Sequence, residues 1–178
     1  RELINAQSNS SFIFKHNVNT LFEDDSKTLW VGTSDGLHRL DRGSNGFTLS
    51  VYQADSNGVG LSNNYVTQIL QDDMGLLIGT RKGLNRLTFK DGSEAEIKKI
   101  LHKNLVDLFV LSMIIDVNSN VWIGTNTGLL KIVYSNGSNF DVSKNVLKTI
   151  DKRLSDVSIN SILRYDESNI WIGTKKLG

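Results

Sequence analysis

Three histidines are the first residues to examine for acid–base or metal chemistry. His16, His38 and His102 stand far apart in the sequence, and they share no position in any repeated pattern. None belongs to a His-x-x-Glu-His arrangement, which places two imidazoles and a carboxylate around a zinc ion. The sequence contains no cysteine, which excludes disulfides and thiolate metal sites. We therefore predict no catalytic residue, no metal and no cofactor.

Two pairs of adjacent carboxylates are candidates for calcium binding. Asp24 precedes Asp25, and Asp72 precedes Asp73, each pair within a polar stretch. Calcium takes about six to eight oxygen ligands, usually from a longer loop with alternating acidic residues. Two neighbouring aspartates in a hairpin turn more often accept hydrogen bonds from their own backbone. We therefore interpret both pairs as turn formers.

Nucleophilic, phosphate-binding and nucleic-acid chemistry receive no support from the sequence. No Gly-x-Ser-x-Gly segment is present to hold a serine nucleophile. Gly58-Val59-Gly60 neither follows a buried strand nor opens a helix, as a phosphate loop would. The 20 basic and 19 acidic residues give a net charge of +1, without the basic surface that nucleic acids require.

The elements that must position any functional residue repeat along the chain. A short apolar segment ending in Gly-Thr occurs four times, at intervals of 45 to 49 residues. A fixed period of this size indicates an array of structural repeats. The four copies begin at Leu29, Leu76, Val121 and Ile170.

Each repeat has the pattern of four short strands. A strand that is apolar on both sides comes first, and a polar turn of Asp, Asn, Ser and Gly then leads into the Gly-Thr strand. Gly36, Gly83 and Gly128 follow where a tight hairpin needs a positive φ. Fourth strands are predicted at residues 47–52, 96–101 and 146–150. Strands covered on both faces favour an all-β fold, a partial β-propeller of about three and a half four-stranded blades.

The predicted blades lie within a single domain, residues 1–178. They occupy residues 17–53, 64–102, 109–151 and 158–178, the last one truncated, while residues 12–15 form the last strand of a preceding blade. A glycine such as Gly32 within a strand allows another backbone to approach closely. Trp30, Trp122 and Trp171 stand two residues before such glycines and could stack on sugars. Their strict place in the repeat favours packing between blades instead.

The repeat resembles the two-component regulator propeller repeat. The resemblance combines an Asn-x-Val-x-x-Ile-x-x-Asp half, here Asn64 to Asp72, with a Gly-Thr-x-x-Gly-Leu half, here Gly79 to Leu84. It covers most of residues 17–174. Two departures are visible: Leu77 replaces the tryptophan of the other copies, and Lys175 to Gly178 do not continue the Gly-Leu pattern.

This resemblance implies a periplasmic sensory ectodomain of a bacterial two-component signalling receptor. Proteins of the family carry such propellers before a β-sandwich domain, a transmembrane helix and an intracellular histidine kinase or, in some members, a diguanylate cyclase. Contact with the membrane would come only through other parts of such a parent protein. Many relatives respond to oligosaccharides, so the implied partner is an oligosaccharide or another small molecule.

Two alternative functions stay open. One is a purely structural or protein-interaction propeller. The other is a lyase or glycosidase on the same fold, because streptogramin-type lyases resemble this propeller group and use a histidine and a glutamate near a bound metal. No such cluster can be identified in the sequence.

Candidate ligand-binding residues stand where the innermost strands begin, at one mouth of the central channel of a propeller. Their asparagines could instead bond to their own backbone. An incomplete ring would expose apolar blade faces and strand edges, so we also expect a homodimer or the rest of a longer propeller as a partner. The candidate residues are Asn17, Asn64, Tyr65, Phe109 and Asn160.

Overall fold

The described residues form only strands, turns and loops. The computed structural model describes residues 2–4, 11–13, 15–44, 46–90, 94–136, 139–144 and 156–175. Within these ranges the chain forms sixteen strands and no helix, and so contains no helix that could cross a membrane. The predicted all-β fold is confirmed.

Three antiparallel sheets of four strands follow one another along the chain, and a two-stranded sheet comes after them. Each sheet is a blade whose strands lie in chain order from one edge to the other. The first blade contains β3 (Val18–Glu23), β4 (Leu29–Thr33), β5 (Gly36–Gly43) and β6 (Gly46–Tyr52). The second contains β7 (Val66–Asp72), β8 (Gly75–Thr80), β9 (Gly83–Lys90) and β10 (Glu94–Lys99). The third contains β11 (Val110–Ile115), β12 (Val121–Thr125), β13 (Gly128–Asn136) and β14 (Asn139–Lys144), and the half-blade contains β15 (Ile159–Arg164) and β16 (Ile170–Thr174).

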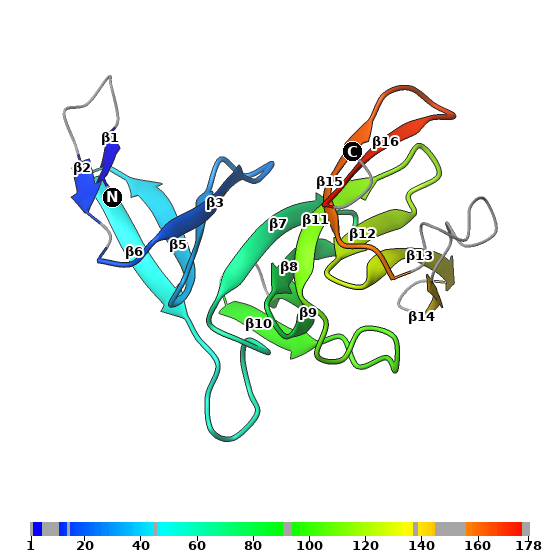
Figure 1. Cartoon of the computed structure of the whole chain (residues 1–178). Coiled ribbons are helices and arrows are strands. Elements are labelled where there is room, and N and C mark those ends of the chain that lie inside the picture. Colours follow the sequence, from blue (N-terminus) through cyan, green and yellow to red (C-terminus); the bar gives the residue numbers. More distant parts are fainter. Residues whose placement is uncertain are drawn as a thin grey trace.

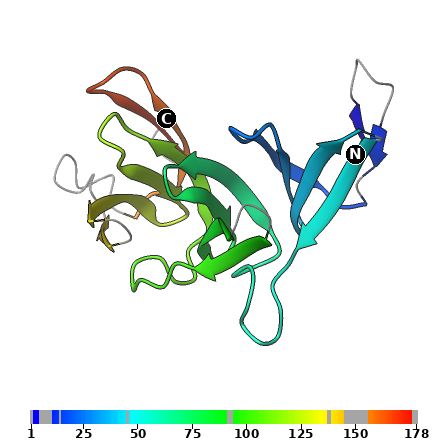
Figure 2. The ribbon, with the colours of Figure 1, turned by 180° about the vertical axis from the view of Figure 1, so that it is seen from behind.

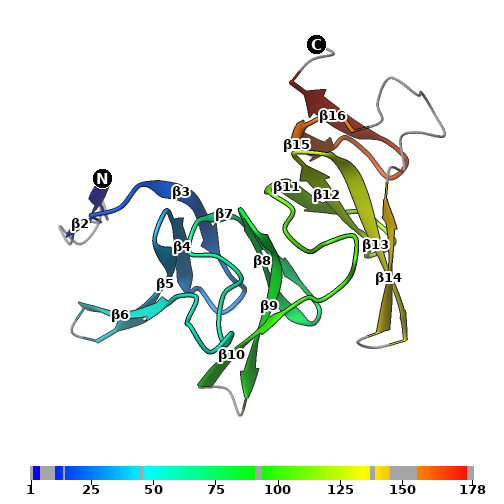
Figure 3. The same ribbon diagram turned by 60° about the horizontal axis from the view of Figure 1, so that its bottom comes forward.

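The first strands of the blades form the inner edge of the molecule. β3 contacts β7, β7 contacts β11, and β11 contacts β15 (Figure 1). Figure 3 shows the blades following one another around an open arc, with the first blade at one end and the half-blade at the other. This is the arrangement of a β-propeller, in which the blades surround a central channel. The predicted partial propeller is confirmed.

A separate hairpin precedes the first blade. β1 (Glu2–Ile4) pairs antiparallel with β2 (Ser11–Ile13), so the strand predicted near residues 12–15 has a partner that the sequence analysis did not anticipate. Residue 14 lies outside the described ranges. In Figure 2 this hairpin and the half-blade lie at opposite ends of the molecule.

Alternate residues of the second strand in each blade face the following blade. In β4 these are Trp30 and Gly32, and Trp30 is fully buried in a cluster that includes Val66 of the second blade. Trp122 of β12 packs in the same way against a cluster that includes Ile159 of the half-blade. The predicted packing role is confirmed for these two tryptophans.

Glycines in the same strands allow the next blade to approach. A Cβ atom placed on Gly32, Gly79 or Gly124 would lie 2.6 Å from an atom of the following blade. Non-bonded carbon atoms prefer separations of about 3.5–4.0 Å, so a side chain does not fit there. The atoms that would be struck belong to Val66, Val110 and Ile159, each the first residue of an inner strand.

An aspartate after the inner strand ties the turn to the tryptophan. The indole N–H of Trp30 donates to Asp24 Oδ2 at 2.8 Å, while Asp24 Oδ1 accepts the backbone N–H of Thr28 at 2.9 Å. Asp72 likewise accepts the backbone N–H of Met74 at 2.9 Å. The prediction that the two aspartate pairs form turns is therefore confirmed for Asp24 and Asp72, whereas the Asp25 carboxylate accepts a hydrogen bond from Gln71 of the second blade.

The second blade compensates for the missing tryptophan. The side chain of Leu77 has no N–H to donate, and Asp72 instead forms an ion pair with Arg86, which lies opposite Leu77 in the sheet. The Arg86 guanidinium also donates to the hydroxyl of Tyr134 in the third blade. Burial raises the pKa of Tyr134, which keeps this hydroxyl protonated. A polar contact between blades thus replaces the indole hydrogen bond.

Two outer strands differ from the prediction. The fourth strand of the third blade is β14, at Asn139–Lys144, and not residues 146–150, which lie outside the described ranges. Its Phe140 and Val142 alternate with polar residues and pair with Tyr134 and Ile132, a pattern too short to stand out in the sequence. In the second blade β10 begins at Glu94, two residues before the predicted start at residue 96.

Both ends of the arc carry exposed apolar residues. Trp171 is 64% exposed, so the predicted packing role is wrong for this tryptophan within the described chain. The reason is that no described blade follows the half-blade to cover it. Leu163, which pairs with Trp171, is also exposed, and at the other end Leu21 of the first blade is 50% exposed.

Candidate functional site

One end of the inner strands is built from a repeated backbone contact. The residue that leads into each inner strand accepts a hydrogen bond, through its carbonyl oxygen, from the residue that follows Gly-Thr in the same blade. These bonds measure 2.9 Å for Ser34 N to Asn17 O, 3.1 Å for Arg81 N to Tyr65 O, 3.1 Å for Asn126 N to Phe109 O and 3.2 Å for Lys175 N to Ser158 O. We call these eight residues the channel mouth, because they lie at the same end of neighbouring inner strands.

A threonine fixes the turn that carries half of these residues. In the second blade Thr80 Oγ1 donates to the carbonyl oxygen of Gly83 at 3.0 Å and accepts the backbone N–H of Lys82 at 3.1 Å. Thr80 is fully buried, and Gly83 has a φ of 99°, which an L-residue adopts only with strain. Thr33 and Thr125 make the same two bonds in the other complete blades. In each complete blade, the backbone of the turn at the mouth is therefore held by the hydrogen bonds of a buried threonine.

Three side chains from two blades come together at this mouth. The guanidinium carbon of Arg81 lies 3.5 Å from the ring centroid of Tyr65 and 5.4 Å from that of Phe109. Arg81 is exposed, whereas Tyr65 and Phe109 are half-buried. The Tyr65–Arg81–Phe109 cluster therefore places a cation and two aromatic rings together at the mouth.

The other predicted ligand residues lie differently. Asn64 Oδ1 accepts the backbone N–H of Ala54 at 2.7 Å, so this side chain holds the loop between the first two blades. Asn17 is exposed and contributes its carbonyl oxygen to the mouth. Asn160 lies inside β15, and its Oδ1 accepts a hydrogen bond from the Ser158 hydroxyl at 2.9 Å. The equivalent mouth position in the half-blade is Ser158, so Asn160 does not join the group.

Arg81 was missed by the sequence reasoning, which concentrated on the start of the inner strands. A signal was nevertheless present. The residue after Gly-Thr differs in every copy, although the residues before it hardly change: it is Ser34, Arg81, Asn126 or Lys175. A varied position inside a uniform motif suits recognition better than packing, because packing positions repeat.

A hollow lined partly by acidic side chains lies at the opposite end of the inner strands. Its volume is about 660 Å³, and Asp25, Asp72 and Asp73 are among the residues that line it. Two of these carboxylates are already engaged, because Asp25 accepts a hydrogen bond from Gln71 and Asp72 pairs with Arg86. Within the described ranges, no group of three or more His, Cys, Asp or Glu side chains could hold a metal ion.

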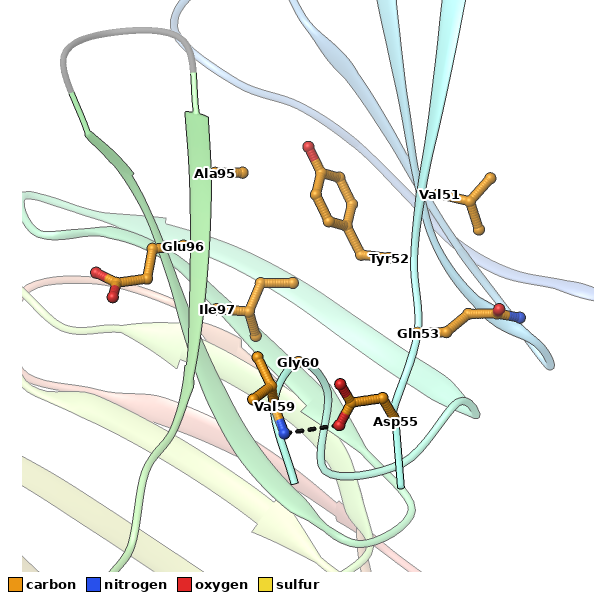
Figure 4. Close-up of a pocket in the computed structure, with 9 residues that line it drawn as sticks. All are labelled: Val51, Tyr52, Gln53, Asp55, Val59, Gly60, Ala95, Glu96 and Ile97. Carbon is orange, nitrogen blue, oxygen red and sulfur yellow. Dashed lines mark hydrogen bonds between the residues drawn. The ribbon is translucent and has the colours of Figure 1, made fainter. Parts of the chain in front are cut away.

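A further cleft of about 470 Å³ lies between the outer strands of the first two blades. Figure 4 shows Tyr52 on one side and Ala95 and Ile97 on the other, while the Glu96 side chain points away. Asp55 bonds the backbone N–H of Val59 at 2.8 Å and so closes its own loop. The lining mixes apolar and polar groups, and its two carboxylates are either engaged or turned away, which makes the cleft a weaker candidate than the mouth.

Part of the first blade matches a known protein family. Residues 13–35 match the two component regulator propeller. The match spans the inner strand and the Gly-Thr strand of the first blade, and it confirms for that repeat the resemblance seen in the sequence. No curated protein matches the sequence significantly.

Solved structures show a likeness of fold over nearly the whole chain. Two crystal structures of the extracellular domain of BT4673 from B. thetaiotaomicron, described in one case as a hybrid two component system and in the other as a one component system, are similar to this chain. One aligns with a TM-score of 0.65, 20% identity and 94% of this chain covered, the other with 0.69, 22% and 96%. The chain spans 23% of the length of each of them.

Proposed function

We propose that this chain is a ligand-sensing segment of a propeller in the periplasmic region of a bacterial transmembrane two-component receptor. The fold supports the proposal, because the similar structures are extracellular domains of signalling systems. The first repeat matches the regulator propeller family, which points to the same class of protein. The receptor would carry its histidine kinase, or a diguanylate cyclase, in other parts of the protein.

The observation that carries the ligand-binding role is the Tyr65–Arg81–Phe109 cluster. Its arginine is exposed and stacks on Tyr65, and its two aromatic rings come from neighbouring blades. A fold that needed these residues only for packing would bury them, as it buries Trp30. Aromatic faces pack against the apolar faces of sugar rings, so the ligand class we propose is an oligosaccharide.

We propose no catalytic role for this segment. The three histidines have different surroundings. His16 pairs with Asp35 at 3.3 Å, His38 is buried within β5, and the ring centroid of His102 lies 6.3 Å from that of Phe140. Burial lowers the pKa of His38, which favours its neutral form. None of the three contacts the Tyr65–Arg81–Phe109 cluster in the described structure.

Calorimetric titration with a panel of neutral and acidic oligosaccharides tests the proposal. We expect saturable binding that falls at least about tenfold in the double variant Tyr65→Ala/Phe109→Ala, which corresponds to about 1.4 kcal/mol. Tyr165→Ala is the matched control, since Tyr165 is an exposed aromatic residue at the other end of the half-blade. If no oligosaccharide binds to the folded protein, a structural or protein-interaction propeller is the better description. Formation of a cleaved product would favour the lyase or glycosidase instead.

A further inference from the structure

No carboxylate within the described ranges pairs with the guanidinium of Arg81, in contrast to two other arginines of the chain. Arg39 pairs with Asp41 at 2.8 Å and Arg86 pairs with Asp72, and both of these arginine side chains are largely buried. Arg81 is exposed and, among the described residues, has no carboxylate partner. An arginine that is held in place without a counter-ion is available to bind one from outside.

Stacking prepares the Arg81 guanidinium for binding. Its central carbon lies 3.5 Å from the centroid of the Tyr65 ring, and its backbone N–H is bonded to the carbonyl oxygen of the same tyrosine. An arginine that stacks on an aromatic face loses side-chain freedom before the ligand arrives, which lowers the entropy cost of binding. The N–H groups of a guanidinium form a planar fork that matches the two oxygens of a carboxylate or of a sulfate.

The eight mouth residues include two cations, Arg81 and Lys175, and no carboxylate. The other mouth residues that follow Gly-Thr are Ser34, Asn126 and Lys175, which can donate hydrogen bonds and carry no negative charge. A hollow of about 190 Å³ beside the same turn is lined by Lys82 and Lys99 as well as by Asp107. With two ammonium groups and one carboxylate, the side chains that line this hollow carry a net positive charge.

We propose that Arg81 makes the channel mouth a subsite for an oxyanion-bearing saccharide, with either a uronate carboxylate or a sulfate ester as the group that is bound. The inference rests on the proposed function and specifies its ligand. The anionic group binds the guanidinium fork, and the sugar ring lies towards Phe109, whose ring centroid is 5.4 Å from the guanidinium carbon. Neutral saccharides reach the same aromatic surface but gain nothing from the charge.

Calorimetry with three probes of the same linkage tests this subsite: a galacturonic acid trimer, a neutral galactose trimer and a sulfated galactose trimer. The protein should bind at least one anionic trimer at least ten times more tightly than the neutral one. Whichever anionic trimer binds more tightly shows whether Arg81 binds a carboxylate or a sulfate ester. Higher salt should weaken anionic binding only, because it screens the charge of an exposed arginine. Arg81→Gln should abolish the preference for the anionic trimers over the neutral one, and Arg81→Lys should retain part of that preference.

Arg42→Gln is the matched control, because Arg42 is an exposed arginine in β5 of the first blade. Equal thermal midpoints for the wild-type, Arg81→Gln and Arg42→Gln proteins would show that folding is unaffected. The subsite is overturned if Arg81→Gln binds the anionic trimers as tightly as the wild-type protein does. It is also overturned if the wild-type protein binds the neutral trimer as tightly as the anionic ones. In both cases the sensing role survives, whereas failure of all three trimers and of the wider panel removes both proposals.

Discussion

Trp122 donates its indole N–H to the carboxylate of Asp116 across 2.8 Å, at the turn that joins β11 to β12. The same carboxylate accepts the backbone N–H groups of Asn118 and Asn120, each at 2.9 Å. One side chain therefore closes the turn and also orients the tryptophan that packs against the half-blade. The Lys131 ammonium lies over the indole ring, 4.8 Å from its centroid, and 3.8 Å from Asp116 Oδ2.

Asp116→Ala should destabilise the protein by about 1–3 kcal/mol, because it leaves buried or half-buried donors without their acceptor. Urea denaturation measures the effect. Asp166→Ala is the control, because in the described structure the Asp166 carboxylate reaches Ser168 and Asn169 but not Trp171. Equal denaturation midpoints for the two variants would show that the indole hydrogen bond adds nothing.

The stability of the protein should also fall in acid through Asp116. Burial opposes ionisation of this carboxylate, but hydrogen bonds from Asn120, Trp122 and the backbone outweigh it and hold the pKa of Asp116 below its usual value. The stabilisation is complete above the unfolded pKa of about 3.9 and is lost as the pH falls through the lower, folded pKa.

Unfolding free energies measured from pH 6 down to pH 2 should therefore decline less steeply for Asp116→Asn than for the wild-type protein. The amide has the same shape but does not titrate in this range. Parallel curves would mean that other carboxylates account for the acid sensitivity.

The sequence predicted those parts of the fold that depend on periodic local patterns. Gly36, Gly83 and Gly128 have the positive φ that the hairpins require, and Trp30 is buried as its repeat position indicates. Side-chain partners across blades could not be predicted in this way. The stacking of Arg81 on Tyr65 depends on how the turn after β8 approaches the start of β7, and periodicity carries no information about that distance.

The loss of stability caused by replacing a glycine in the second strand of a blade should depend on whether another blade packs against that glycine. Gly124→Ala should cost about 1–3 kcal/mol, because the new methyl group would strike the backbone carbonyl of Ile159 at 2.6 Å. Gly173→Ala meets only Ser161 of its own sheet, whose hydroxyl can rotate away, and should be nearly neutral. A thermal melt of the two variants distinguishes them, and similar losses would show that the space at Gly124 is not set by the contact between blades.

The two ends of the arc should be covered when the protein is assembled. Trp30 is 0% exposed beneath the second blade, while Trp171, at the same repeat position, is 64% exposed. The opposite end offers the matching surface, since β3 of the first blade begins with Val18, the equivalent of the residues that pack over Gly32 and Gly79. We therefore predict that the 178-residue chain forms a homodimer through these end faces, unless further blades of a longer propeller cover them.

Light scattering of the isolated chain over a range of concentrations measures this association. Trp171→Glu should shift the chain towards the monomer, because it places a charge on the apolar face that the partner must cover. Leu101→Glu is the matched control, since Leu101 is 80% exposed in the loop that follows β10 and lies on neither end face. A wild-type chain that stays monomeric at high concentration contradicts the homodimer, and further blades of a longer propeller then become the expected cover for Trp171.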